Sequence, residues 1–191
     1  EQVDNAVKLV QPQLNEVYQE WEKNLKEKLS AYDVAFQAVQ ERIDRYDRII
    51  GSVETLEEVS DAIGNVSEAH HFVAQLLAND IGDSDDRVKR TRILFALIQR
   101  VKDKQIKGES NDYYNLATAL AQYNYYELAS DVVEVGLEFF NENTDLRSSA
   151  ASYSHKAGLT DRVTKALAVL EKDNRNKWNW RAFTYYIDII N

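Results

Sequence analysis

The sequence predicts an all-α protein. Glycine occurs only six times and proline once in 191 residues, whereas strand-rich proteins need both at their many turns. Apolar residues recur along most of the chain at intervals of three and four, which is the period of an amphipathic helix. They make up 44% of the composition, enough to build a buried core. We therefore expect a long N-terminal helical region followed by packed helix pairs.

The first 50 residues are predicted to form one long helix with an apolar seam. Two steps of four follow each other at Trp21, Leu25 and Leu29, so the register slips there and a break near Ser30 stays open. Two interpretations also stay open: a helix packed on its own neighbours, or the stalk or dimerisation arm of a coiled coil. The seam consists of Leu14, Tyr18, Trp21, Leu25, Leu29, Tyr32, Phe36, Val39, Ile43, Tyr46 and Ile50.

Glycines and polar segments divide the rest of the N-terminal half. Gly51 should end the long helix and let the chain turn back as a hairpin, whose returning helix stops at Gly64. A further helix begins at Ser67, and a basic amphipathic helix covers 84–103. The polar loop 103–112 is the predicted domain boundary. The N-terminal region is thus 1–109, with the long helix at 1–50, a degenerate repeat at 50–83 and the basic helix, and the second domain is 110–191.

A helix-pair pattern that begins at Tyr113 recurs further along the chain, with a period of about 34 residues. Large residues (Tyr113, Leu116 and Leu120) line the inner side of the first helix, and small ones (Ala117, Ala129 and Gly136) stand where two helices must cross closely. A shift by one period places Ala151 on Ala117 and Gly158 on the turn residue Asn124. The segment resembles a tetratricopeptide repeat, best over 111–191.

This resemblance implies a right-handed superhelix whose first helices line a concave groove for a peptide or a partner helix. It lacks the paired Lys and Asn residues with which some family members hold a terminal carboxylate, so we do not expect that ligand. The groove residues implied by the family pattern are Asn111, Tyr114, Thr118, Gln122, Ser148, Ser152, His155 and Lys156.

Basic residues gather in 87–107, although the whole chain carries a net charge of −9. The patch at its start is formed by Arg87, Lys89, Arg90 and Arg92. It is interpreted first as an internal counter-face for the acidic N-terminal helices. A solvated face and a contact for an anionic surface are the alternatives. Because the chain as a whole is acidic, we do not expect it to bind nucleic acid generally.

The sequence offers no recognisable catalytic or metal site. The absence of cysteine excludes disulfides and thiolate metal ligands. His70 and His71 are adjacent, so they should point about 100° apart on a helix and not share a metal ion. A Gly-rich phosphate loop and a nucleophile elbow are missing from the sequence. We therefore expect no cofactor, no metal and no enzymatic activity.

These observations favour a scaffold for protein–protein interaction, with a protein or peptide as partner and a homodimer through the N-terminal helix as a further option. The alternative is a structural or regulatory helical segment of a larger enzymatic or membrane-anchored protein. The compartment is left open by the composition; the cytoplasm is favoured, an upstream signal or membrane anchor stays open, and membrane contact is expected only with such an upstream tether.

Overall fold

The computed structural model describes residues 2–52, 63–78, 84–172, 184 and 189. All secondary structure in these residues is helical, which confirms the predicted all-α class. The chain divides into two compact units, Glu1–Asp47 and Arg48–Asn191. The returning helix of the predicted hairpin, at 53–62, lies outside the described residues, and so does most of 173–191 at the end of the predicted repeats.

Helix α1 runs without interruption from Gln2 to Ser52, so the predicted long helix is present but includes Gly51, which was expected to end it. There is no break near Ser30. Ion pairs one turn apart, such as Lys26 to Glu22 at 2.8 Å, lie along the helix and support it locally. Its one proline, Pro12, does not end the helix.

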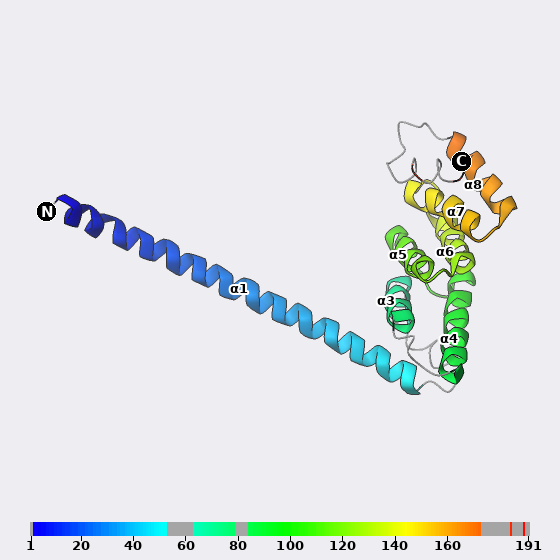
Figure 1. Cartoon of the computed structure of the whole chain (residues 1–191), viewed down its shortest axis with the longest axis horizontal. Coiled ribbons are helices and arrows are strands. Elements are labelled where there is room, and N and C mark those ends of the chain that lie inside the picture. The colour runs from blue at the N-terminus through cyan, green and yellow to red at the C-terminus, as the bar shows by residue number, and fades with distance from the viewer. Residues whose placement is uncertain (1, 53–62, 79–83, 173–183, 185–188, 190–191) are drawn as a thin grey trace. The chain divides into compact units, whose positions relative to one another are not determined.

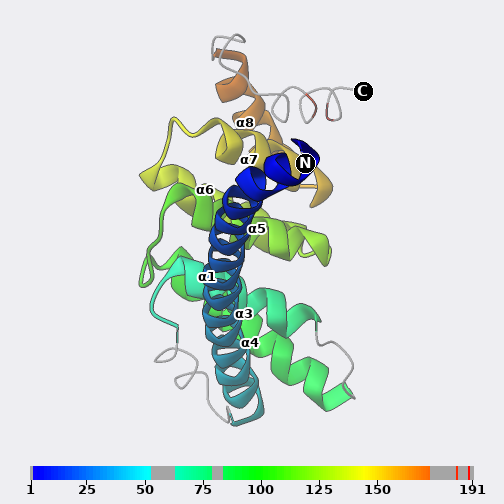
Figure 2. The same cartoon turned by 90° about the vertical axis from the view of Figure 1, so that its left-hand side faces the viewer.

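The second unit is a stack of short helices (Figures 1 and 2). They are α3 (Val66–Ala78), α4 (Ser84–Lys102), α5 (Ser110–Gln122), α6 (Tyr126–Phe139), α7 (Thr144–Lys156) and α8 (Thr160–Lys172). Helix α3 packs on α5, α5 on α6, α6 on α7 and α7 on α8. Helix α4 is outside this succession and packs instead on α6 and α3.

The predicted domain boundary at the loop 103–112 is corrected by this packing. Helices on both sides of the loop belong to one unit, because α3 packs on α5 and α4 on α6. The loop itself returns to α3, where the backbone N–H of Val66 donates to the carbonyl of Lys107 at 3.1 Å. The division falls instead after Asp47, inside the long helix.

The turns after α5 and α7 have the same construction. Asn124 and Gly158, one repeat period apart, both adopt the left-handed conformation, with φ of 65° and 73°. The N–H of the next residue bonds to a carbonyl five positions back, in Tyr125 to Leu120 and in Leu159 to Ser154. This pattern is the Schellman motif, which satisfies carbonyls left open at a helix end. The helices recur with the same period, since α7 begins as far after α5 as α8 begins after α6.

The core of the stack has the predicted alternation of large and small side chains. Tyr113, Leu116 and Leu120 are fully buried, and so is Ala117. A Cβ atom added to Gly136 would lie 2.9 Å from Cβ of Tyr113, closer than side chains tolerate. The missing side chain at 136 therefore allows α6 to approach α5 closely.

Candidate interaction site

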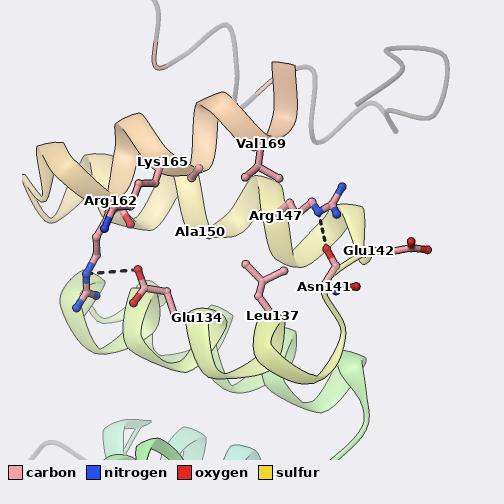
Figure 3. A pocket seen from close by; sticks show the side chains of 11 residues that line it. Glu134, Leu137, Asn141, Glu142, Arg147, Ala150, Arg162, Lys165 and Val169 are labelled. Atoms are coloured by element: carbon pink, nitrogen blue, oxygen red, sulfur yellow. Dashed lines mark hydrogen bonds and ion pairs between the residues drawn. The ribbon is translucent and has the colours of Figure 1, made fainter. Parts of the chain in front are cut away.

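A cavity of about 460 Å³ opens between α6, α7 and α8 (Figure 3). This volume lies in the usual range for pockets that hold a small ligand or a few side chains of a partner. The lining residues are Glu134, Leu137, Asn141, Glu142, Arg147, Ala150, Ser154, Arg162, Lys165, Ala166 and Val169.

The middle of the cavity is apolar. Leu137 of α6 and Val169 of α8 point toward each other across the space in Figure 3. Ala150 of α7 and Ala166 of α8 also line it, and these short side chains leave room where longer ones would close the gap between the helices. The apolar lining thus results from small residues on two packed helices and needs no special backbone conformation.

At one end of the cavity, Arg162 and Glu134 belong to a network of charged and hydroxyl groups. Arg162 of α8 donates to the carboxylate of Asp131 at 2.7 Å and lies 3.3 Å from that of Glu134. The Asp131 side chain is only 8% exposed, and Lys102 of α4 also donates to it at 2.7 Å. Behind it, the hydroxyls of Ser130 and Ser154 are 2.8 Å apart. Asp131 thereby joins α4 and α8 to α6.

Burial and charge act in opposite directions on this network. Burial raises the pKa of the Glu134 carboxyl, while Arg162 opposes the rise. For Arg162, burial by itself lowers the pKa of the guanidinium. The hydrogen bond to Asp131 and the charge of Glu134 outweigh burial, so its pKa is raised overall. The guanidinium is therefore held charged at this end of the cavity.

The other end of the cavity is also polar. Nε of Arg147 donates to the backbone carbonyl of Asn141 at 2.6 Å, which ties α7 to the turn after α6 (Figure 3). Glu142 and Lys165 add one charge of each sign to the rim. An apolar middle between charged ends suits an apolar side chain that is flanked by polar groups.

None of the predicted groove residues lines this cavity. Ser148 and Ser152 are buried, with 1% and 4% of their surface exposed, so they are not on an accessible wall. The Ser148 hydroxyl donates to carbonyls one turn back, at Thr144 and Asp145. Thr118 is half-buried and bonds to Tyr114 and Tyr153.

The other predicted groove residues reach the surface to different degrees. Asn111, Gln122, His155 and Lys156 are exposed or partly exposed, and Tyr114 is half-buried. Lys156 lies over the ring of Tyr126, with Nζ 5.3 Å from the ring centre. The buried serines interrupt the row on α7, so the predicted residues do not form one continuous surface. The cavity was missed because its residues come from three helices, and the repeat pattern gives no sign of how these leave a gap.

The basic segment makes several contacts within the second unit. Arg100 donates to the carbonyl of Ile63 at 3.0 Å, and Arg90 donates to that of Leu76 at 3.3 Å. Further along, Lys104 pairs with Glu138 and Lys107 lies over the ring of Phe139. Two acidic partners of this segment, Asp131 for Lys102 and Glu138 for Lys104, come from α6. The predicted role as a counter-face for the acidic N-terminal helices stays a prediction, while these contacts tie the segment to α6 and to residues in and just before α3.

In the predicted patch itself, Arg87 and Arg92 are exposed, while Lys89 and Arg90 are half-buried. Arg87 and Arg90 also lie at a smaller cavity of about 200 Å³, together with Tyr123 and Tyr125. Within the patch, Arg90 thus makes a structural contact with α3, and Arg87 and Arg92 carry charge that solvent can reach.

The two adjacent histidines lie closer than the sequence suggested. Their ring centres are 4.8 Å apart, although neighbouring positions on a helix diverge. Burial lowers the pKa of the His70 imidazole, and the charge of His71 lowers it further, against an opposing effect of Asp112. Within the described ranges, no group of three or more His, Asp or Glu side chains could hold a metal ion.

Comparisons with known proteins add no assignment to this geometry. No protein-family model, curated protein or solved structure matches the chain. None of the described helices combines the length and the apolarity needed to cross a bilayer.

Proposed function

We propose that the chain is a non-enzymatic module for protein–protein interaction, built from helix pairs of the tetratricopeptide type. The regular recurrence of helices and turns supports this repeat type. The observation that carries the interaction function is the cavity between α6, α7 and α8. In this proposal the cavity takes the place of the predicted groove on α5 and α7.

The proposed occupant is a peptide or helix that inserts an aliphatic side chain. Leu137 and Val169 would contact this side chain, because apolar burial is the main favourable contribution in such a pocket. Lys165 at the rim would attract a neighbouring carboxylate on the peptide. The short serine and alanine side chains of α7 form the floor.

A site-specific photo-crosslinker would test where the partner binds. Val169 lies at the cavity and is partly exposed, while Gln122 lies on the predicted groove. With the crosslinker at Val169, exposure of the chain to extract of its source should yield an adduct whose partner peptide is identified by mass spectrometry. The same crosslinker at Gln122 is the control. An adduct at Gln122 alone would favour the α5–α7 surface and contradict the cavity, and adducts at neither position would contradict both.

The identified peptide would then be titrated against cavity variants. Ala166→Leu fills the apolar middle, and we expect about tenfold weaker binding because the space for the inserted side chain is lost. Gln122→Ala should bind like the wild type. Circular dichroism of both variants checks that the fold is intact. Unchanged affinity in Ala166→Leu would show that the peptide does not enter the cavity.

A further inference from the structure

Helix α1 carries an exposed apolar seam between Tyr18 and Val39. Trp21 is 58% exposed and Phe36 is 69% exposed, although both are aromatic. The seam consists of Tyr18, Trp21, Leu25, Leu29, Tyr32, Phe36 and Val39, all of them exposed. Toward the end of the helix the exposure stops, since Ile43 is half-buried and Tyr46 is buried. A contiguous apolar face of this kind normally indicates an interaction surface.

The spacing of the seam is that of a coiled coil. From Tyr18 to Val39 the chain advances in six steps of three or four, a mean of about 3.5 residues per step. A helix with this period keeps its apolar face toward a partner helix that winds around it. At about 1.5 Å per residue the seam is about 32 Å long, and the heptad register slips once within it, at the two steps of four from Trp21 to Leu29. It is therefore long enough to pair with one equally long helix.

The polar side of α1 has local partners along the helix itself. Lys26 pairs with Glu22 at 2.8 Å, and the amide of Gln40 donates to Asp44 at 3.0 Å. Lys23 lies 4.0 Å from Glu27. Some charged side chains on the polar side are thus paired within the same helix, whereas the apolar side chains of the seam are exposed.

The charges beside the seam identify the partner. With Leu29 and Phe36 at the a positions and Tyr32 and Val39 at the d positions, Lys28 stands at g and Asp33 at e. In a parallel, in-register pair of identical helices, each g residue meets the e residue five positions further along the partner. Lys28 of one chain then faces Asp33 of the other, and symmetry forms this pair twice.

An antiparallel pair would not have this complementarity. If the two seams overlapped fully in opposite directions, Tyr18 would meet Val39 and Leu25 would meet Tyr32 of the second chain. The two Lys28 side chains would then lie beside each other at the centre, where like charges repel. Asp33 would lie level with Asn24 and within two residues of Lys26 of the second chain, so the repulsion between the two Lys28 side chains is what disfavours this orientation. The charge pattern therefore distinguishes the two orientations.

From the exposed seam, its heptad period and the opposite charges at Lys28 and Asp33, we propose that two copies of this chain associate through α1 as a parallel, in-register coiled coil. The proposal is independent of the cavity in the second unit. It concerns residues 18–39 and leaves α3–α8 unchanged in each copy.

Sedimentation of the whole chain over a range of concentrations tests the association. The wild type should shift from monomer to dimer as its concentration rises. Leu29→Glu places a charge in the seam and should raise the dissociation constant by about a hundredfold, because two carboxylates would be buried together. Val34→Glu, on the outer side of the same helix, is the matched control and should dimerise normally. A wild type that stays monomeric at all concentrations, or a Leu29→Glu variant that still dimerises, would overturn the proposal.

Charge reversal tests the pairing of Lys28 with Asp33. Lys28→Asp should weaken the dimer by about tenfold. The new aspartate of each chain would face Asp33 of the other, so two repulsive contacts replace two attractive ones. The double variant Lys28→Asp with Asp33→Lys restores opposite charges and should recover most of the affinity. If the double variant is as weak as the single one, the two residues do not face each other.

Cysteine cross-linking tests the orientation, and the chain has no cysteine of its own to interfere. Tyr32→Cys places a thiol at a d position, where identical residues of a parallel dimer lie close enough to form a disulfide. Mild oxidation should therefore produce a covalent dimer with Tyr32→Cys and none with Val34→Cys. A dimer that sediments normally but does not cross-link at residue 32 would be antiparallel or out of register, and would contradict the proposal.

Discussion

At the scale of single residues, the stack depends on a few positions where no other side chain fits. Gly136 is the clearest, because an added Cβ would lie 2.9 Å from Cβ of Tyr113 and 3.3 Å from Leu146. The Cβ atom of Tyr113 moves only with its backbone, so the two helices would have to separate. Asp131 is a second such position, since its buried carboxylate accepts hydrogen bonds from two cations.

Gly136→Ala should lower the free energy of unfolding by about 1–2 kcal/mol. Overpacking a tight contact costs about 1–3 kcal/mol, and this exceeds the gain of at most about 1 kcal/mol from the better helix propensity of alanine. Urea unfolding measures the difference. Gly64→Ala is the matched control, because the nearest atom to its added Cβ is 3.7 Å away and ordinary contact results. A Gly136→Ala variant as stable as the wild type would show that the crossing can relax.

His70 should make the protein less stable as the pH falls. Burial lowers the pKa of its imidazole in the folded protein below the ordinary value of 6.5. The unfolded chain therefore takes up the proton first, and stability decreases as the pH falls from about 6.5 toward the lower folded pKa. Above that window both states are neutral at His70, so it contributes no pH dependence.

Thermal unfolding between pH 7.5 and pH 5 measures this effect. His70→Gln should reduce the loss of stability across that range. His155→Gln, at an exposed position on α7, serves as the control and should retain the loss. Identical pH profiles for wild type and His70→Gln would contradict the assignment.

At the scale of elements, α6 holds its neighbours through both packing and charge. It packs on α5 and α7, and its acidic side chains form ion pairs with residues of α4 and α8. Asp131 pairs with Lys102 of α4 and Arg162 of α8, while Glu138 pairs with Lys104 just after α4. The placement of α4 beside α6 is thus stabilised by ion pairs that differ in burial.

Asp131→Asn should lower the free energy of unfolding by about 1–3 kcal/mol, because hydrogen bonds to a buried charge contribute about that much each. The estimate is moderate because Lys102 and Arg162 are partly exposed and can regain water. Glu138→Gln on the same helix is the control, and its exposed ion pair should contribute at most about 1 kcal/mol. Equal effects of both changes in urea unfolding would show that burial of Asp131 does not matter.

The helix bounds could be predicted from the sequence, whereas the packing of α4 could not. The bounds of α5 to α8 follow the repeat period that was expected, because helix ends depend on local residues such as Asn124 and Gly158. The place of α4 could not be derived, since its apolar face would pack equally well on any apolar neighbour. Specific polar contacts, such as Lys102 with Asp131 and Arg100 with the carbonyl of Ile63, distinguish one neighbour from another.

At the scale of the whole molecule, the two units suggest a division of roles. The second unit carries the cavity that we propose as the partner site, and α1 carries the seam that we propose as the dimer contact. A dimer would present two cavities, and a partner with two binding segments would then be held more tightly than by either cavity alone. The two proposals are separable, since Leu29→Glu affects only association and Ala166→Leu affects only the cavity.

The sequence by itself determined the all-α class, the long first helix, the large-and-small pattern of the core and the positions of the turns. These features depend on periodicity and on local backbone preference, and both are properties of residues that are close together in the sequence. Only the tertiary structure decided that α3–α8 form one unit, that Ser148 and Ser152 are buried, and that a cavity lies between α6, α7 and α8. Those features depend on which faces meet, and a stripe of apolar residues does not specify its neighbour.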